Sequence, residues 1–422
     1  MKLFRTLVMA TGLLLLSASA PLGLAPRLQP VAVSAGQLPG LAGQPRERLA
    51  LMVWVAGGWQ PAPFQVDPAD ASGYLFGSAT LTGATPPGPL GALDEIAFMA
   101  SDLGEHSEAA PGPGPAWEVE VSVGDEKRYG YLWLAPGTPP RSKADYVAYQ
   151  RDPSRESIAT PRYIQSFAPE AAFYSDLAVL PPDGNGRDMY DRLKLRSKVT
   201  TVGGVEVRYS EADFHSRVTG VRDGPVRVIR QNRTSLDVLL GLKTPEALVN
   251  EIFWRDSFEV PSELSLPYGA NLVISKFDYY QGCDLNRAVG PFTFQADVGG
   301  PVAVDGRMTP AEKAMTQSNQ DHRWGMVSGQ AGSVFYIAEW FERSAPVKLR
   351  LYYMDDATMP DGPENEPGQS MYGIRLENGL KLAGAGQKLN FRVFILPAGT
   401  SVEEAKGLLG PVKVRISPIN HP

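Results

Sequence analysis

The stretch Arg192-Leu193-Lys194-Leu195-Arg196-Ser197-Lys198-Val199 alternates charged or polar side chains with apolar ones. The same period appears in Lys348-Leu349-Arg350-Leu351-Tyr352 and in Asn390-Phe391-Arg392-Val393-Phe394. Successive side chains of a β-strand point to opposite faces, so this pattern predicts strands with one apolar and one largely polar face. Such half-buried strands favour antiparallel sheets packed as a sandwich over a parallel α/β sheet, whose strands are continuously apolar.

Short strands joined by turns are predicted along most of the chain. Gly (43) and Pro (37) make up about a fifth of the 422 residues, and they show no collagen period. Three short helices are expected, at 244–254, from Thr309 onward and at 401–408, because each begins with a residue that caps helices well. The chain should therefore be all-β, a large antiparallel β-sandwich with a few short helices. The predicted strands are 50–55, 94–100, 117–123, 129–135, 145–150, 192–200, 205–209, 214–221, 225–233, 272–280, 292–297, 333–341, 347–354, 388–397 and 412–416.

The first 25 residues read as a signal peptide. Lys2 and Arg5 precede an apolar run from Leu7 to Leu16, and Ala18-Ser19-Ala20 supplies the small residues that a signal peptidase needs. No apolar stretch reaches the roughly 20 residues that a membrane span requires, so we expect release into a periplasm or secretion. We place an N-terminal β region at 26–155, packed on a main antiparallel β-sandwich at 156–422.

Composition excludes several classes of function. The chain has 40 Lys plus Arg against 46 Asp plus Glu, and loss of Lys2 and Arg5 with the signal peptide moves the net charge from −6 to −8. A protein of this charge is not expected to bind nucleic acid as a whole. The single Cys283 cannot form an intramolecular disulfide, and we interpret it as a buried, inert thiol rather than a catalytic one. No Walker loop, Rossmann glycine pattern or GxSxG motif occurs.

Three blocks of sequence resemble known proteins. The blocks 94–104 (DEIAFMASDLG), 191–196 (DRLKLR) and 223–230 (DGPVRVIR) are similar to segments of uncharacterised secreted β-supersandwich proteins. That fold group resembles the galactose mutarotases and the large β-domains of polysaccharide lyases. The resemblance implies a supersandwich-like fold over about 45–415. It implies no activity, since one sandwich architecture hosts lyases, isomerases, hydrolases and binding modules.

The segment from Arg187 to Arg233 is cationic, with eleven Lys or Arg against six acids. On a strand, alternate cations would project from one side and repel one another, so they need anions nearby. A polyuronate, a sulfated glycan or an anionic partner surface would supply them. The alternative is a solvated face balanced by acids of neighbouring strands. The candidate ligand-binding residues are Arg192, Lys194, Arg196, Lys198 and Arg227.

Candidate groups for catalysis and metal binding are few. A lyase acting on acidic sugars needs proton-transfer groups of the Tyr or His type, for which His215, Tyr209 and His322 are candidates. Glu339 and Glu342 are one possible carboxylate pair for glycoside hydrolysis. Oxygen ligands for calcium could come from Asp355, Asp356 and Asp361, although an ordinary acidic loop explains the same residues and no other cofactor is indicated.

Two hypotheses follow for the function. In the first, the chain is an exported, non-catalytic binding or accessory protein whose basic strand face engages an anionic glycan or an exported protein partner. In the second, it is a carbohydrate-active enzyme, of the polysaccharide lyase or mutarotase kind, that acts on acidic sugars. The first is favoured because no convergent catalytic set can be read from the sequence.

Overall fold

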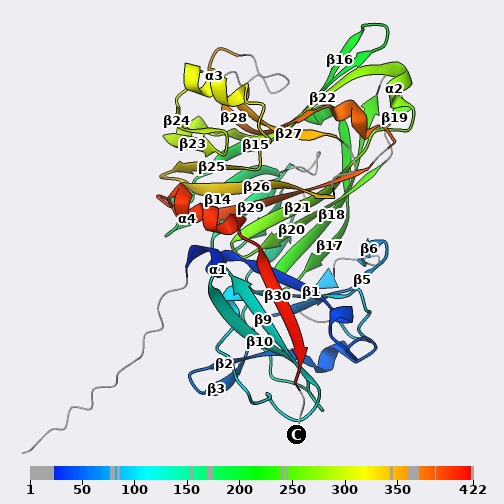
Figure 1. The fold of residues 1–422 in the computed structure, drawn as a ribbon, viewed down its shortest axis with the longest axis vertical. Helices are drawn as coiled ribbons and strands as arrows, with labels where there is room; N and C mark the ends of the chain where they lie inside the picture. The colour runs from blue at the N-terminus through cyan, green and yellow to red at the C-terminus, as the bar shows by residue number, and fades with distance from the viewer. Residues whose placement is uncertain are drawn as a thin grey trace, which may run out of the picture.

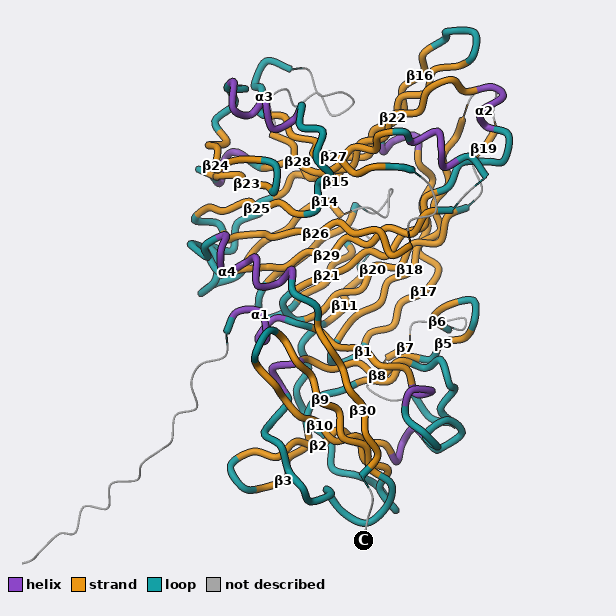
Figure 2. Tube along the Cα trace, in the orientation of Figure 1, coloured by secondary structure: helices purple, strands orange, loops and turns teal. Residues whose placement is uncertain are grey.

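The computed structural model describes residues 23–419 apart from 77–80, 83–85, 153–154, 169–173, 239–241, 244–245, 343–345, 360–369 and 385. Strands dominate the described chain (Figure 2). They pair antiparallel, with the short β7 (Leu81–Thr82) against β17 (Phe214–Asp223) as a parallel exception. The predicted all-β sandwich is confirmed. The predicted signal peptide falls almost wholly on residues 1–22, outside the described part. Among the described residues, no helix has the length and hydropathy needed to cross a bilayer.

The largest sheet has eleven strands and forms one wall of the upper part of the molecule (Figure 1). The central strand β29 (Gln387–Leu396) contains the alternating stretch 390–394. Its apolar side chains enter the core on one face of the sheet, and the other face stays partly polar. In spatial order its strands are β24 (Gly299–Val304), β23 (Phe292–Ala296), β25 (Trp324–Gly329), β26 (Gly332–Glu342), β29 (Gln387–Leu396), β21 (Ser257–Leu264), β20 (Ala247–Trp254), β18 (Arg227–Val238), β17 and β7, with β19 (Leu242–Lys243) paired to β18.

Two further sheets pack against this wall. Their shared core is rich in aromatic residues and includes Phe294 and Tyr336 from the large sheet with Tyr372 and Leu285 opposite. Burial of these side chains is the main source of stability expected for a sandwich of this kind. One sheet runs β16 (Glu206–Tyr209), β15 (Tyr190–Thr201), β22 (Ile274–Leu285), β28 (Ser370–Glu377) and β27 (Lys348–Met354), and the other runs β11 (Ala148–Arg151), β12 (Glu156–Ala159), β13 (Tyr163–Phe167) and β14 (Tyr174–Val179).

The lower part of the molecule is a smaller sandwich with its own core. Val31 and Phe98 from one sheet meet Leu51, Val119 and Leu132 from the other. The division near residue 155 stays a prediction, and the C-terminal strand β30 (Val412–Pro418) lies in this lower part, paired with β9. The sheets are β1 (Pro30–Ser34), β8 (Glu95–Met99), β4 (Gln65–Asp67); β3 (Gly58–Pro61), β2 (Leu49–Val55), β10 (Glu126–Leu134), β9 (Ala116–Val123), β30; and the pair β5 (Ala69–Asp70), β6 (Gly73–Tyr74).

The helices are short, as expected. Thr309 caps α3 (Pro310–Thr316) by accepting a hydrogen bond from the Glu312 backbone N–H, and Ser401 caps α4 (Val402–Lys406) in the same way. Both predicted helices are confirmed. The helix predicted over 244–254 is wrong, because residues 247–254 form β20 between β18 and β21. The remaining α-helices are α1 (Leu24–Leu28) and α2 (Ala270–Val273), the latter at the start of the predicted strand 272–280.

Two of the three blocks that resemble known proteins, 94–104 and 223–230, meet where the lower sandwich joins the large sheet. Ala97 and Met99 of β8 pack with Val226 and Ile229 beside Trp254. A second contact is made by α1 and α4, which cover part of the outer face of the large sheet. The blocks 94–104 and 223–230 therefore serve to join the two sandwiches, which is a structural role.

Candidate ligand-binding groove

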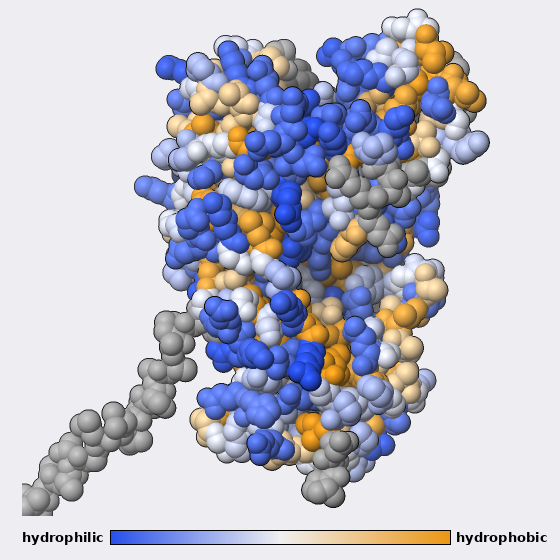
Figure 3. Space-filling model, in the orientation of Figure 1, coloured by the Kyte–Doolittle hydropathy of each residue, from blue (hydrophilic) through white to orange (hydrophobic). Residues whose placement is uncertain are grey.

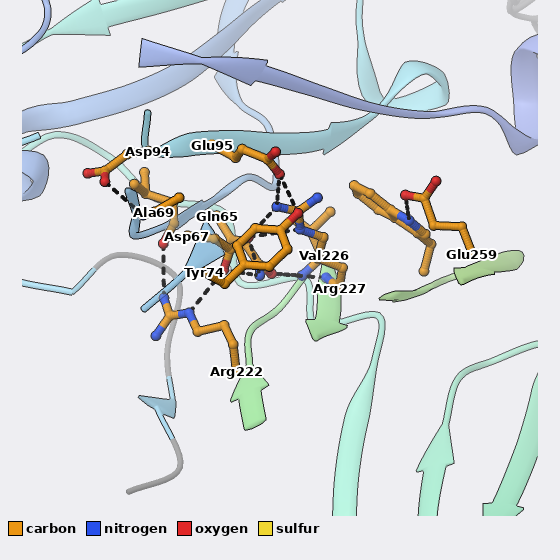
Figure 4. Close-up of polar contacts among 12 residues, drawn as sticks. Gln65, Asp67, Ala69, Tyr74, Asp94, Glu95, Arg222, Val226, Arg227 and Glu259 are labelled. Carbon is orange, nitrogen blue, oxygen red and sulfur yellow. Dashed lines mark hydrogen bonds and ion pairs between the residues drawn. The ribbon is translucent and has the colours of Figure 1, made fainter. Parts of the chain in front are cut away.

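A buried ion-pair network joins the lower sandwich to the large sheet (Figure 4). Asp67 lies between two arginines: Arg222 Nε donates to its Oδ1 at 3.1 Å, and Arg227 Nε donates to its Oδ2 at 2.8 Å. Gln65 Nε2 also donates to Asp67, while Gln65 Oε1 accepts from the backbone N–H groups of Val226 and Arg227. Asp67 and Arg227 are each 1% exposed, so these charges are compensated by one another rather than by water.

Arg227 has a second acidic partner, Glu95, whose Oε2 accepts from Arg227 Nη2 at 2.6 Å. Burial alone would raise the pKa of Glu95, but the charge and hydrogen bond of Arg227 hold this pKa below its usual value. The guanidinium carbon of Arg227 also lies 4.9 Å from the ring centroid of Trp254. The guanidinium of Arg227, a predicted ligand contact, is thus enclosed by partners from its own protein.

The other candidate ligand contacts lie on β15, as predicted, but they do not form one exposed surface. Lys194 is fully buried, and of the four cations on this strand only Arg192 is exposed. Acids from β22, from the 3-10 turn Glu211–Asp213 and from β16 reach the same side of the strand. The expectation of a continuous cationic ribbon is therefore wrong, and the alternative of acids from neighbouring elements describes the structure. The pairs are Lys194 with Asp284 (2.8 Å), Arg196 with Glu211, and Lys198 with Glu206 (3.3 Å).

Two of the proton-transfer candidates occupy different surroundings near β16 and β17. Tyr209 is buried in an apolar cluster with Val199 and Leu236. His215 is exposed on β17, where its Nε2 lies 2.7 Å from Asp237 Oδ2. The ring of Tyr209 thus contributes to packing, and His215 is half of a surface pair.

The third candidate, His322, is fully buried before β25. Its Nδ1 lies 2.5 Å from Asp297 Oδ1, and its Nε2 lies 2.6 Å from the Tyr336 hydroxyl. Both ring nitrogens are therefore engaged by protein groups. His215, paired with Asp237, and His322, paired with Asp297 and Tyr336, thus contact different partners.

Two of the predicted calcium ligands, Asp355 and Asp356, make separate hydrogen bonds within the protein. Asp355 is fully buried, and its carboxylate accepts hydrogen bonds from the backbone N–H groups of Asp305 and Gly306 at 2.7 and 2.8 Å. Asp356 accepts hydrogen bonds within its own turn, and Asp361 lies outside the described residues. Within the described ranges, no group of three or more His, Cys, Asp or Glu side chains could hold a metal ion. Asp355 anchors the loop that contains Asp305 and Gly306.

A polar groove lies at the waist of the molecule, where α1, β1 and the start of β30 pass over the outer face of the large sheet (Figure 1). Its volume is about 590 Å³, which is within the usual size range of small-molecule sites. A smaller depression of about 290 Å³, beside Phe64 and Arg141, lies on the lower sandwich. The large groove combines one wall of charged side chains with one wall of small and apolar ones. The charged wall comprises Glu259, Arg323, Glu339 and Arg392.

The charged wall is built by neighbouring strands in register. Glu259 of β21 stands opposite Arg392 of β29, and Glu339 of β26 stands opposite Asn390 of β29. Arg323 Nη2 donates to Glu339 Oε1 at 3.3 Å, and Arg392 Nη2 donates to Glu339 Oε2 at 3.1 Å. Hydrogen bonds at 3.3 Å are at the long end of the normal range, so polar groups of a ligand could replace them at small cost.

Glu259, on the same charged wall, is held in a similar way. Trp254 Nε1 and Asn390 Nδ2 donate to its two oxygens, each at 3.3 Å. Trp254 itself is buried, so it orients Glu259 and does not offer a ring face for a sugar to stack on.

Two buried amide atoms beside the groove have no hydrogen-bond partner among the described residues. They are Nε2 of Gln29, which lines the groove, and Oδ1 of Asn390. Both side chains are at most 5% exposed. A buried polar atom without a partner costs free energy, so both amides are sites of local strain beside the groove.

The sequence pointed to one member of this groove, Glu339, as half of a carboxylate pair, while the side chain of Glu342 lies outside the described part. Glu259, Arg323 and Arg392 carried no signal of their own, because they are ordinary polar positions of half-buried strands. Their convergence depends on strands separated by up to about 130 residues, as the hydrogen bond between Asn390 and Glu259 illustrates.

Comparisons with known proteins give structural alignments at low sequence identity. No protein-family model matches the chain, and no curated protein matches it. Among solved structures, an alpha-mannosidase from Enterococcus faecalis V583 aligns with a TM-score of 0.49 and 8% identity, over 92% of this chain and 44% of that chain. A glycosyl hydrolase family 38 protein from Enterococcus faecalis aligns with a TM-score of 0.47 and 8% identity, over 93% and 46%. This chain thus spans less than half the length of those proteins, and no residue role is transferred from them.

Proposed function

We propose that this chain is an exported, non-catalytic binding protein whose waist groove holds a neutral, hydroxyl-rich ligand of the oligosaccharide class. The observation that carries the proposal is the charge-balanced wall of the groove, in which Arg323 and Arg392 flank Glu339 through hydrogen bonds of 3.3 and 3.1 Å. A sugar hydroxyl both donates and accepts hydrogen bonds. It therefore suits a wall where guanidinium donors and carboxylate acceptors alternate within one groove.

The balance of charge supports a neutral ligand over an anionic one. The groove wall has two arginines and two glutamates, so its formal charge is zero. An anionic glycan would gain from Arg323 and Arg392 but be repelled by Glu259 and Glu339. The cations of β15 that suggested an anionic ligand are met largely by acids of the same chain.

A carbohydrate-active enzyme is the second candidate, favoured by one observation. Glu259 and Glu339 line the same groove, and glycoside hydrolysis commonly uses two carboxyl groups that flank the bond. Binding is preferred because both oxygens of each glutamate already accept hydrogen bonds from protein donors. An assay for new reducing ends, after long incubation with a bound oligosaccharide, distinguishes a binding protein from an enzyme. A binding protein produces no new reducing ends. An enzyme produces them, and its Glu339→Gln variant does not.

A glycan array tests the binding proposal. The mature protein should bind neutral oligosaccharides more strongly than sulfated or uronate-containing ones. The double variant Arg323→Gln, Glu339→Gln should lose this binding. The matched control is Lys127→Gln, Glu120→Gln, which removes a surface ion pair of 2.9 Å on the lower sandwich and should bind as the unmodified protein does. Absence of binding to every neutral glycan, or equal binding by the groove variant, would contradict the proposal.

Export has its own test. The proposal rests on the cationic start, apolar run and small residues of the first 25 positions. Mass spectrometry of the protein made in a bacterial host should show a chain shortened by about 20 to 25 residues in the periplasmic or culture fraction. A full-length chain retained in the cytoplasm would contradict export without touching the groove.

A further inference from the structure

An exposed apolar surface lies at the far end of the molecule from the lower sandwich. We call it the apolar tip: Val202, Val205, Tyr268, Leu272 and Val273, which are between 59% and 96% exposed. It is formed by the hairpin of β15 and β16 together with α2, at the upper right of Figure 1, where Figure 3 shows apolar residues gathered on the surface. The Val202 backbone N–H donates to the Val273 carbonyl at 3.0 Å, so the two segments lie side by side.

The tip is a fixed feature rather than a loose loop. Val202 and Val205 flank the turn of the hairpin, where Gly204 has a φ of 81° that suits glycine. The Thr201 hydroxyl accepts a hydrogen bond from the Val205 backbone N–H at 3.0 Å. Directly behind the tip, Ile274 packs on the buried cluster of the hairpin. The apolar side chains are thus held outward by ordered structure.

Charged side chains surround the base of the tip. Three are basic, namely Lys198, Arg208 and Lys276, and two are acidic, Glu206 and Asp278, so the net charge of these five is +1. Arg208 and Lys276 are exposed. An apolar end backed by exposed cations matches the order of layers in a bilayer surface, where hydrocarbon lies beneath anionic head groups.

We propose that the apolar tip inserts into the surface of a lipid bilayer and holds the protein there. A second copy of the chain fits less well. The five side chains expose on the order of 500 Å², below the roughly 800 Å² per partner of a stable protein interface. The tip also projects from the molecule. Two projecting tips could therefore bury only part of their exposed apolar area against each other. A shallow insertion of Leu272, Val273 and the Tyr268 ring needs no complementary surface, and an aromatic side chain with a polar end suits the interface.

Vesicle flotation tests this proposal with the full mature chain. The unmodified protein should float with vesicles of phosphatidylcholine containing phosphatidylglycerol, and the variant Tyr268→Ser, Leu272→Ser should bind at least about tenfold more weakly, because it loses two large apolar groups. Both side chains are exposed, so circular dichroism should show the same melting temperature for the variant. The matched control is Leu75→Ser, Leu93→Ser, which removes two exposed leucines of the lower sandwich and should float as the unmodified protein does.

Three results would overturn the proposal. The unmodified protein could fail to float with these vesicles, the tip variant could float equally well, or light scattering could show a dimer that the tip variant converts to a monomer. The last result would assign the tip to a second copy of the chain. None of these results bears on the waist groove, whose glycan binding is measured without vesicles.

Discussion

Asp67 of the lower sandwich accepts a hydrogen bond from Arg227 of the large sheet at 2.8 Å, and the two residues are 160 positions apart in the sequence. Arg222 Nε donates to the other carboxylate oxygen. The contact joins two separately packed cores, which sets the position of β1 and β30 over the outer face of the large sheet and so shapes the waist groove.

Replacement of Asp67 by Asn should destabilise the protein strongly. The amide cannot neutralise two buried guanidinium groups, so the loss should be about 3 to 5 kcal/mol in the free energy of unfolding. Urea denaturation monitored by circular dichroism measures it. The control Lys127→Gln removes a solvent-exposed cation and should leave the denaturation midpoint unchanged. A midpoint for Asp67→Asn equal to that of the unmodified protein would show that the network contributes nothing.

Replacement of Gly224 by Ala should disturb the same junction without altering any charge. A Cβ at this position would lie 2.4 Å from Gln65 Oε1, the atom that accepts from the Val226 and Arg227 backbone N–H groups. We expect a loss of about 1 to 3 kcal/mol. Gly137→Ala is the matched control, because nothing lies within 4 Å of its Cβ position. Equal thermal stability of the two variants would contradict the close packing of Gln65 on this turn.

Asp188 should make stability depend on pH. Burial, with the nearby Asp176 and Asp191 charges, raises the pKa of Asp188 to about 6 from 3.8. The folded state therefore binds this proton more tightly than the unfolded state, so the carboxylate destabilises the fold above pH 6 and this effect disappears as the pH falls toward 4.

The variant Asp188→Asn keeps an oxygen that can accept from the Leu177 and Tyr190 backbone N–H groups but has no charge. At pH 7 it should be more stable than the unmodified protein by about 1 kcal/mol, and near pH 4 the two should be equal. Thermal unfolding at both pH values checks this. A difference between the two proteins that is the same at pH 7 and pH 4 would contradict the raised pKa.

Cys283 should be unreactive in the folded protein. Although the residue is only partly buried, its sulfur lies 2.8 Å from the Tyr174 hydroxyl, and burial raises the pKa of the thiol to about 12. At pH 8 the thiolate is scarce, so a disulfide reagent should react more than about 100-fold faster after unfolding in urea. Rapid labelling of the folded protein would instead indicate an accessible, activated thiol.

The sequence was sufficient to predict where the strands lie, but not which of their polar side chains are buried or paired. Alternation located β15, β27 and β29, because the period of two is a local property of the chain. It also suggested that polar side chains face solvent, and here it was misleading: Lys194, Arg227 and Arg350 are nearly or fully buried. Their acidic partners lie on other strands or turns, and no local pattern reveals such pairing.

The wrong helix at 244–254 has a related cause. A Thr-Pro-Glu start suits a helix, but Val249, Ile252 and Phe253 are residues that fit strands well. Hydrogen bonding to β18 on one side and β21 on the other decides between the two. The groove could not be predicted from the sequence either, because Glu259, Arg323 and Glu339 converge only after the strands have paired.

The most direct test of the waist groove as a binding site is a calorimetric titration with the neutral oligosaccharide that binds best on the array, at 50 and 500 mM salt. We predict a Kd that is almost the same at both salt concentrations, because the ligand has no charge to be screened, and no detectable binding by Arg323→Gln, Glu339→Gln. Equal affinity of that variant and the unmodified protein, or affinity that falls steeply with salt, would contradict a neutral ligand held in this groove.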